Sequence, residues 1–247
     1  ARAWLVIAMA VPALAAGVLL VPDLERRWAF LQRAARLLLR LMGIPLTVQG
    51  ASGSGPPQGI VVSNHCSYID PAVLVAALPG PFSFVAKSEL RRLPVVGALL
   101  ERIGVVFVER FDKRRGAVDA RQLQRLAAAG RPLLFFAEGT ISRMPGLLPF
   151  HMGAFLVAAR AGAAIRPVAI RGTRSILRAD TWFFHRGRLR VMPLPPVEPA
   201  PQTAGGKAGP WGSALDLHHR TREAILRHCG EPDLGTEVSP LLREARG

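Results

Sequence analysis

Ser63-Asn64-His65-Cys66-Ser67-Tyr68-Ile69-Asp70 is the stretch of this 247-residue chain that decides the predicted fold. The β-branched run Ile-Val-Val at residues 60–62 precedes it, and an apolar pattern typical of a helix follows at residues 71–78. We therefore expect His65 to lie where a strand leads into a helix. In an α/β sheet, this junction is where ligands bind and where catalytic groups are found.

His65 and Asp70 are spaced so that they could form a base and its partner. A histidine that removes a proton near neutral pH needs one free ring nitrogen, and a carboxylate can hold the N–H of the other. Such a base would activate a hydroxyl of the substrate directly, without a nucleophilic side chain of the protein. The alternative is an ordinary turn, in which Asn64 or Ser67 caps the following helix and His65 is an incidental surface residue.

The composition indicates an anionic partner. The chain has 32 Lys and Arg against 17 Asp and Glu, a net charge of +15. It has a single Tyr and no basic run interleaved with aromatic residues, which argues against nucleic acid. An anionic membrane or a phosphorylated substrate fits better, because the arginines stand beside Leu, Ala and Trp. The two cysteines are far apart and no His/Cys cluster has metal-ligand spacing, so we expect a reducing compartment and neither metal nor cofactor.

The N-terminus is predicted to associate with a membrane. Residues 3–22 carry no charge and as a helix would be long enough for ~30 Å of hydrocarbon. Residues 25–42 form an amphipathic pattern with arginines on one face, typical of the cytoplasmic flank of a retained anchor and of a helix in the headgroup layer. The alternatives are a cleaved signal peptide, and a second helix that packs on its own domain with a solvated basic face. We expect the first 42 residues to provide attachment without contributing to the chemistry.

Between these helices and the C-terminus, apolar strands alternate with helices, which predicts an α/β fold. We expect a mainly parallel central sheet with helices on both faces, plus the N-terminal membrane-associated helical pair. The predicted parts are an anchor with its amphipathic helix at 1–44, an α/β domain at 45–195, and a linker with a C-terminal helix at 196–247. The expected strands after residue 63 are 82–85, 104–108, 133–136, 165–170 and 189–192.

Further polar residues follow predicted strands and should meet at the same sheet edge. Arg110 offers a planar fork that suits phosphate, and Glu138-Gly139-Thr140 offers a glycine turn whose amides could face an anion. Arg166-Pro167 is a fourth such place. Taken singly, Arg110 is better explained as a surface arginine of the basic run at residues 110–115, and residues 138–140 as an ordinary turn between a strand and a loop. Their order and spacing together favour one site.

In this order, the motifs resemble those of the glycerolipid acyltransferases typified by 1-acyl-glycerol-3-phosphate (lysophosphatidic acid) acyltransferase. The resemblance covers roughly residues 46–192. Its four blocks are the H-x4-D block Asn64–Asp70, the block Gly104–Arg110, the block Glu138–Ser142, and the proline-containing strand Ile165–Ile170. The third block has Ile141 where the family pattern E-G-T-R-S has arginine, although Arg143 follows closely.

The resemblance implies acyl transfer from acyl-CoA or acyl carrier protein to a lysophospholipid at the cytoplasmic face of the inner membrane, without a cofactor. His65 would be the general base and Asp70 its orienting partner. The substrate-binding residues implied are Lys87, near the thioester or phosphate, and, around the acceptor headgroup or in the fourth block, Arg110, Glu138, Gly139, Thr140, Arg143 and Pro167. Lysophosphatidic acid is the first expected acceptor. The missing arginine leaves open whether Arg143 replaces it or the acceptor is another lysolipid, such as a lyso-ornithine lipid.

Two other functions are compatible with parts of the pattern. A hydrolase would use His65 on water instead of a lipid hydroxyl. A non-catalytic basic module for membrane surfaces would explain the charge and the arginine-bearing helix, but it leaves the His65/Asp70 pair and the strand-end motifs without a purpose.

Overall fold

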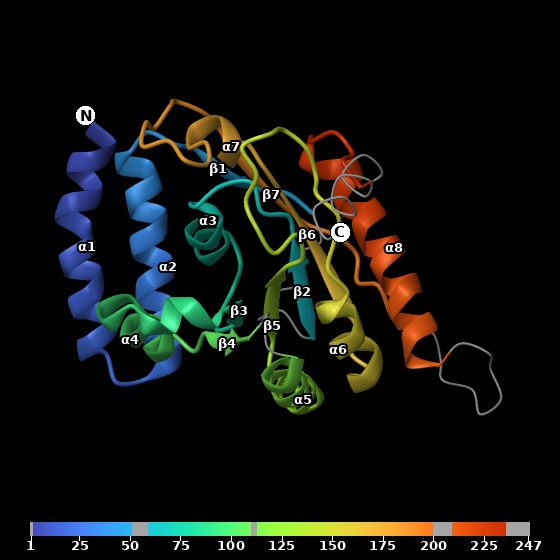
Figure 1. Cartoon of the computed structure of the whole chain (residues 1–247). Helices are drawn as coiled ribbons and strands as arrows, with labels where there is room; N and C mark the ends of the chain where they lie inside the picture. The colour runs from blue at the N-terminus through green and yellow to red at the C-terminus, as the bar shows by residue number, and fades with distance from the viewer. Residues whose placement is uncertain (1, 51–58, 110–112, 200–208, 236–247) are drawn as a thin grey trace.

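The computed structural model describes residues 2–50, 59–109, 113–199 and 209–235 (Figure 1). One seven-stranded sheet lies at its centre. The strands are β1 (Leu46–Val48), β2 (Ile60–Ser63), β3 (Ser83–Lys87), β4 (Val106–Val108), β5 (Leu133–Phe136), β6 (Ile165–Arg171) and β7 (Leu189–Pro193). The helices are α1 (Arg2–Leu20), α2 (Leu24–Leu41), α3 (Asp70–Ala77), α4 (Pro94–Arg102), α5 (Lys113–Ala128), α6 (Gly153–Ala161), α7 (Thr173–Ile176) and α8 (Pro210–Cys229), with a 3₁₀ helix η1 (Ser88–Arg92) before α4.

The sheet is mainly parallel, as predicted, in the order β1-β7-β6-β2-β5-β3-β4. The pair β6–β7 is antiparallel, and every other pair is parallel. The exception has a local cause. The connection from Arg171 to Leu189 contains only the four-residue helix α7, whereas a parallel crossover usually includes a full helix that carries the chain back to the other end of the sheet. The carboxyl ends of β2, β3, β4 and β5 therefore share one edge.

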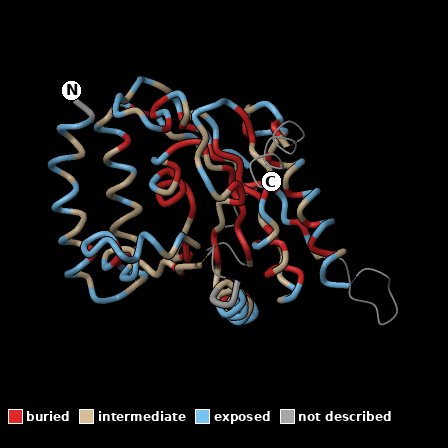
Figure 2. Tube along the Cα trace, viewed as in Figure 1, coloured by how far each residue is buried: buried red, intermediate tan, exposed pale blue. Residues whose placement is uncertain are grey.

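Helices cover both faces of the sheet, and each face has its own core (Figures 1 and 2). Strand β2 is buried on both sides and divides its side chains by alternation: Ile60 and Val62 belong to the cluster under α6 and α8, and Val61 to the cluster under α3. Fully burying one such side chain contributes ~1.5–3 kcal/mol. The strand that carries His65 at its end is therefore held rigidly from both sides.

The second N-terminal helix packs on the body of the protein. Asp23 caps α2 by accepting a hydrogen bond from the Arg26 amide at 2.9 Å. Trp28 is buried against Phe82 with ring centroids 4.5 Å apart, and Arg36 donates to the Ala76 carbonyl of α3 at 2.7 Å. The predicted helix is confirmed, with an apolar side that belongs to the core. Arg26, Arg33, Arg36 and Arg40 remain exposed, whereas Arg27 is buried and donates to the carbonyls of Val21 and Pro22.

None of the described helices combines the length and the hydropathy that a bilayer span requires. The membrane association of the N-terminal pair, α1 and α2, is thus not confirmed and stays a prediction.

Helix α8 is the C-terminal helix predicted within residues 196–247, and it packs on β6 and α6. Ala214, Leu217 and Ile225 are buried in the same core as Ile60 and Val62. The chain after the proline-rich stretch is therefore an integral layer of the fold. The residues 230–235 that follow α8 return to the loop after β5, where Leu147 and Asp233 form a β-bridge.

Candidate active site

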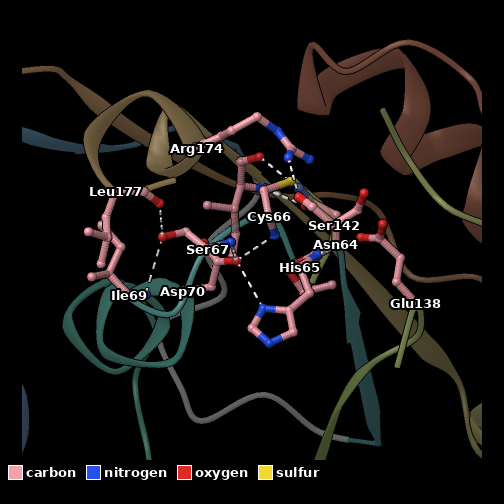
Figure 3. Close-up of polar contacts among 12 residues, drawn as sticks. Asn64, His65, Cys66, Ser67, Ile69, Asp70, Glu138, Ser142, Arg174 and Leu177 are labelled. Atoms are coloured by element: carbon pink, nitrogen blue, oxygen red, sulfur yellow. Dashed lines mark hydrogen bonds and ion pairs between the residues drawn. The ribbon is translucent and has the colours of Figure 1, made fainter. Parts of the chain in front are cut away.

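His65 and Asp70 form the predicted pair (Figure 3). The Nδ1 atom of His65 lies 3.0 Å from Asp70 Oδ2, and the same carboxylate oxygen accepts hydrogen bonds from the amides of Cys66 at 2.7 Å and Ser67 at 2.8 Å. Because a carboxylate only accepts, Nδ1 carries the hydrogen and Nε2 is left with a free lone pair. In Figure 3 the second ring nitrogen points away from the polar cluster.

The local sequence explains why His65 is held in this orientation. Its ring stacks on Phe136 at the end of β5, with centroids 4.0 Å apart. Just before it, the Asn64 side chain donates to the carbonyl of Ile170 at 2.9 Å and accepts from the amide of Ile170 at 2.8 Å, so it extends the pairing of β2 with β6. The Ser67 hydroxyl donates to the Leu177 carbonyl at 2.7 Å.

These contacts contradict the alternative of a simple N-cap turn. The residue at the cap of α3 is Ile69, which has no capping side chain. The Asn64 side chain bonds to β6, and the Ser67 hydroxyl donates to Leu177 and accepts only a long bond, 3.4 Å, from the Ile69 amide. The side chain of His65 is only 16% exposed, and that of Asp70 is fully buried. His65 is therefore not an incidental surface residue.

Glu138 occupies a different place from the one predicted for a headgroup ligand. Its buried carboxylate accepts hydrogen bonds from the amide of His65 at 2.6 Å and from the amide of Leu148 at 2.9 Å. Burial raises the pKa of Glu138 to about 7, although the two amide hydrogen bonds and Arg174 counteract that rise. Glu138 thus ties the backbone of the turn that carries His65 to the loop after β5, and its oxygens accept hydrogen bonds from amides instead of lining the cavity.

His65 opens into a cavity of about 730 Å³ with mostly apolar walls. Of the predicted site residues, Lys87, Gly139 and Thr140 line the same cavity. Gly139 has a φ of +68°, a conformation that glycine adopts at little cost and that turns the chain just after β5. The structure therefore brings together residues from the ends of β2, β3 and β5, as the parallel sheet predicted.

Three other predicted residues lie elsewhere or cannot be placed. Arg143 is exposed, and its Nε is 3.6 Å from Asp180 at the surface. Pro167 is buried within β6, opposite Val62 in the sheet, and is not among the cavity-lining residues. Arg110 lies outside the described residues, so its role as a phosphate ligand stays a prediction.

Several residues of the site were not predicted. Phe136, Tyr68 and Ile141 line the cavity, together with Ile7 and Leu14 of α1. Helix α2 adds further lining residues, so the first 42 residues form part of the cavity wall, while the expectation that they do not contribute to the chemistry stays a prediction. The lining residues of α2 are Leu31, Ala35, Leu38, Leu39 and Met42. The amphipathic pattern of α2 could have indicated these residues, because its apolar side must be covered by another part of the protein or by lipid.

The comparison with known proteins agrees with this geometry. The family model described as Acyltransferase matches residues 46–171, just over half of the chain. The chain belongs to this acyltransferase family.

Individual relatives carry more specific names. The chain is 35% identical over 134 residues to a 1-acyl-sn-glycerol-3-phosphate acyltransferase of Chlamydomonas reinhardtii, covering 53% of this chain and 40% of that protein. It is 36% identical over 159 residues to a lyso-ornithine lipid O-acyltransferase of Pseudomonas aeruginosa, covering 59% and 58%. The chain spans about half the length of the curated relatives that it matches.

Among solved structures, the fold is similar to that of the 1-acyl-sn-glycerophosphate (LPA) acyltransferase PlsC from Thermotoga maritima. The TM-score is 0.67 at 22% sequence identity, over 86% of this acyltransferase-family chain and 83% of that one. This likeness concerns the fold.

Proposed function

We propose that this member of the acyltransferase family transfers a fatty acyl group from a thioester, acyl-CoA or acyl carrier protein, to the free hydroxyl of a lysophospholipid. The observation that carries the proposal is that the free nitrogen of the His65/Asp70 pair faces a large apolar cavity. A general base needs a hydroxyl within reach, and an apolar cavity suits an acyl chain.

The proposed reaction needs only groups that the site and the substrates contain. His65 Nε2 takes the proton of the lipid hydroxyl as its oxygen attacks the thioester carbonyl carbon. The tetrahedral intermediate then expels the thiolate, which takes the proton from the imidazolium, so an ester and a thiol are formed. Asp70 stabilises the imidazolium and keeps Nδ1 protonated. The thioester is already activated, so no cofactor is part of the proposal.

For the acceptor, we infer lysophosphatidic acid, with phosphatidic acid as product. Lys87, Gly139 and Thr140 line the cavity near His65 and would face the headgroup. The guanidinium of Arg110 would donate two hydrogen bonds to the phosphate. Glu138 would act indirectly, by fixing the backbone on both sides of the headgroup site.

One feature of the cavity favours a second acceptor. Ile141 lines it at the position where the family pattern has arginine. An apolar side chain there gives no charge for a phosphate, which fits a lysolipid whose headgroup is not a simple phosphate. Two of the relatives are named as lyso-ornithine lipid O-acyltransferases, so this lipid class is the second candidate.

The Ile141→Arg variant tests the acceptor. We expect it to raise kcat/KM for lysophosphatidic acid relative to lyso-ornithine lipid by ~10-fold or more, since a charge-assisted hydrogen bond contributes ~1.5–3 kcal/mol. The measurement is initial-rate kinetics with both acceptors and one acyl donor. Ile141→Gln, which adds polarity without charge, is the control. An unchanged acceptor ratio in Ile141→Arg would show that residue 141 does not face the headgroup.

We further infer that the protein works at an anionic membrane, on the cytoplasmic side of the inner membrane. Figure 2 shows α1 exposed along its outer side. The exposed large apolar residues of this region are Leu5, Met9, Val11, Leu19 and Leu20 of α1, Val95 and Val96 of α4, and Trp182 and Phe183 of the loop after α7. That loop is joined to α1, because the Trp4 indole donates to the Trp182 carbonyl at 2.6 Å. Apolar surface of this extent marks a contact with lipid or protein.

Vesicle sedimentation at high salt tests this attachment. Met9 and Leu20 are 74% and 79% exposed, so Met9→Asp/Leu20→Asp should leave the fold intact. Each apolar side chain that enters lipid contributes ~1.5–3 kcal/mol, so we expect at least ~10-fold weaker binding to phosphatidylcholine/phosphatidylglycerol vesicles. Leu215→Asp, on the far side of the molecule in α8, is the matched control. If the double variant binds like the wild type, α1 does not provide the attachment.

The function itself is tested by mixing purified protein, labelled acyl-CoA or acyl carrier protein, and a panel of lysolipids. Labelled diacyl product confirms transfer and identifies the acceptor. Release of free fatty acid alone would instead establish a hydrolase. Tight vesicle binding without turnover of any donor would favour the non-catalytic membrane module.

A further inference from the structure

The guanidinium of Arg174, in α7, bonds to two segments that are far away in the sequence: the loop after β5, at Ser142 (Figure 3), and the segment after α8. Its Nη1 donates to the Ser142 carbonyl at 2.6 Å, and its Nε donates to Glu231 at 2.9 Å. Burial lowers the pKa of Arg174, but interactions led by the hydrogen bond with Glu231 outweigh that effect and raise it. Ser142 follows the cavity wall Gly139-Thr140-Ile141, and Leu177, at the end of α7, accepts the hydroxyl hydrogen of Ser67 in the His65 turn at 2.7 Å.

Glu231, in the segment after α8, completes the connection. While one oxygen accepts from Arg174, the other accepts from the amide of Gly146 at 2.7 Å. The side chains of Arg174 and Glu231 are only 11% and 12% exposed. A charged pair at this depth has little water to replace a lost partner, so breaking it is costly, unlike the exposed pairs on α8.

The loop from Ser142 to Leu148 is therefore fixed along its length from outside the cavity. Arg174 holds the carbonyl of Ser142, Glu231 holds the amide of Gly146, and Glu138 holds the amide of Leu148. Between the last two, Leu147 donates to the Pro232 carbonyl at 2.8 Å and accepts from the Leu234 amide at 3.1 Å. The C-terminal segment thus contributes to the position of a wall that begins at Gly139.

We propose that Arg174 and Glu231 are positioning residues that set the distance between His65 and the acceptor-binding loop. Helix α7, which carries Arg174, contacts the His65 turn through the hydrogen bond from the Ser67 hydroxyl to the Leu177 carbonyl. The pair holds the loop at Ser142 and Gly146, so the turn and the loop are fixed relative to each other. Neither residue lines the cavity, so both act through the groups they hold. This inference rests on the proposed acyl transfer to an acceptor bound beside residues 139–141.

The test uses conservative variants that keep the charge or the shape. Arg174→Lys retains a positive charge but loses the planar fork that reaches Glu231 and Ser142 together. Glu231→Gln retains the shape but offers one acceptor oxygen in place of two. Because a misplacement of ~1 Å can cost ~10²-fold in rate, we expect each variant to lower kcat/KM for the lysolipid by ~10–100-fold. The KM for the acyl donor should change less than the KM for the acceptor.

Three further measurements separate positioning from a general loss of stability. Amide hydrogen exchange should become faster in residues 139–148 of both variants, while the sheet keeps its protection. The double variant Arg174→Lys/Glu231→Gln should lose little more activity than either single variant, since the two residues act as one unit. Arg227→Lys, in an exposed pair with Glu223 on α8 whose side chains are 66% and 48% exposed, is the control that should leave kinetics unchanged.

Folded variants with wild-type acceptor kinetics and unchanged exchange in the loop would overturn the proposal. So would losses that only match a smaller folded fraction, measured by circular dichroism. Failure of the proposed function has a different signature, because the wild type itself would then transfer no acyl chain to any lysolipid. In that case the exchange measurement alone decides whether the pair orders the loop.

Discussion

His65→Ala is expected to lower kcat for acyl transfer by ~10²–10⁴-fold, which is what a positioned general base contributes. The upper end applies if no other base reaches the hydroxyl. Among the described residues that line the cavity, the remaining basic side chain is Lys87, and a protonated ammonium cannot accept the proton. Steady-state kinetics with a lysolipid acceptor and a thioester donor measure the effect, and the KM for the donor should change little.

His228→Ala is the matched control, because His228 is exposed near the end of α8 and bonds only to the Ala224 carbonyl of its own helix. Circular dichroism should show both variants folded, since the His65 ring is at the end of β2 and not within either core. A folded His65→Ala protein with the kcat of the wild type would rule out the mechanism and leave the cavity as a binding site for lipid.

The sheet edge was predictable from sequence because β2, β5 and β6 are short apolar runs buried on both sides. Such runs in alternation with helices specify a parallel sheet, and a parallel sheet collects its strand ends at one edge. The approach of His65, Lys87, Gly139 and Thr140 follows from that topology. The antiparallel pairing of β7 was not predictable in the same way, since strand direction depends on the path of the preceding connection.

The sequence was less informative about whether a polar side chain points into the cavity or toward the backbone. Glu138 belongs to a motif that indicates substrate binding, yet its carboxylate faces the amides of His65 and Leu148. Adjacent residues of this turn differ in their surroundings: Glu138 bonds to backbone amides, and Gly139 lines the cavity. Neither the charge of a residue nor its spacing in the motif predicts which of the two it will do. The role of α2 as a cavity wall escaped prediction for a related reason, because an amphipathic pattern shows that one side is covered but not by what.

Asp70→Asn should also lower kcat by ~10²–10⁴-fold, with the fold retained and little change in the acceptor KM. Asp70 Oδ2 accepts three hydrogen bonds, from His65 Nδ1 and the amides of Cys66 and Ser67. If the asparagine oxygen takes this place, the three bonds persist but the imidazolium loses its negative partner. If the asparagine nitrogen takes it, two backbone N–H groups face another donor and Nδ1 must accept, so the proton moves to Nε2 and the base is blocked.

Nitrogen-15 NMR of the His65 side chain distinguishes these two cases, because it reports which ring nitrogen is protonated, and kinetics on the same sample measure the loss. Asp216→Asn is the control, since that carboxylate is exposed on α8 in a pair with Arg220 and lies outside the cavity. The kcat losses of Asp70→Asn and His65→Ala should then be compared. If the two losses are similar, the imidazole is inactive without its carboxylate. If Asp70→Asn instead retained the kcat of the wild type with Nδ1 still protonated, backbone geometry alone would orient His65, and the buried carboxylate would serve only to close the turn before α3.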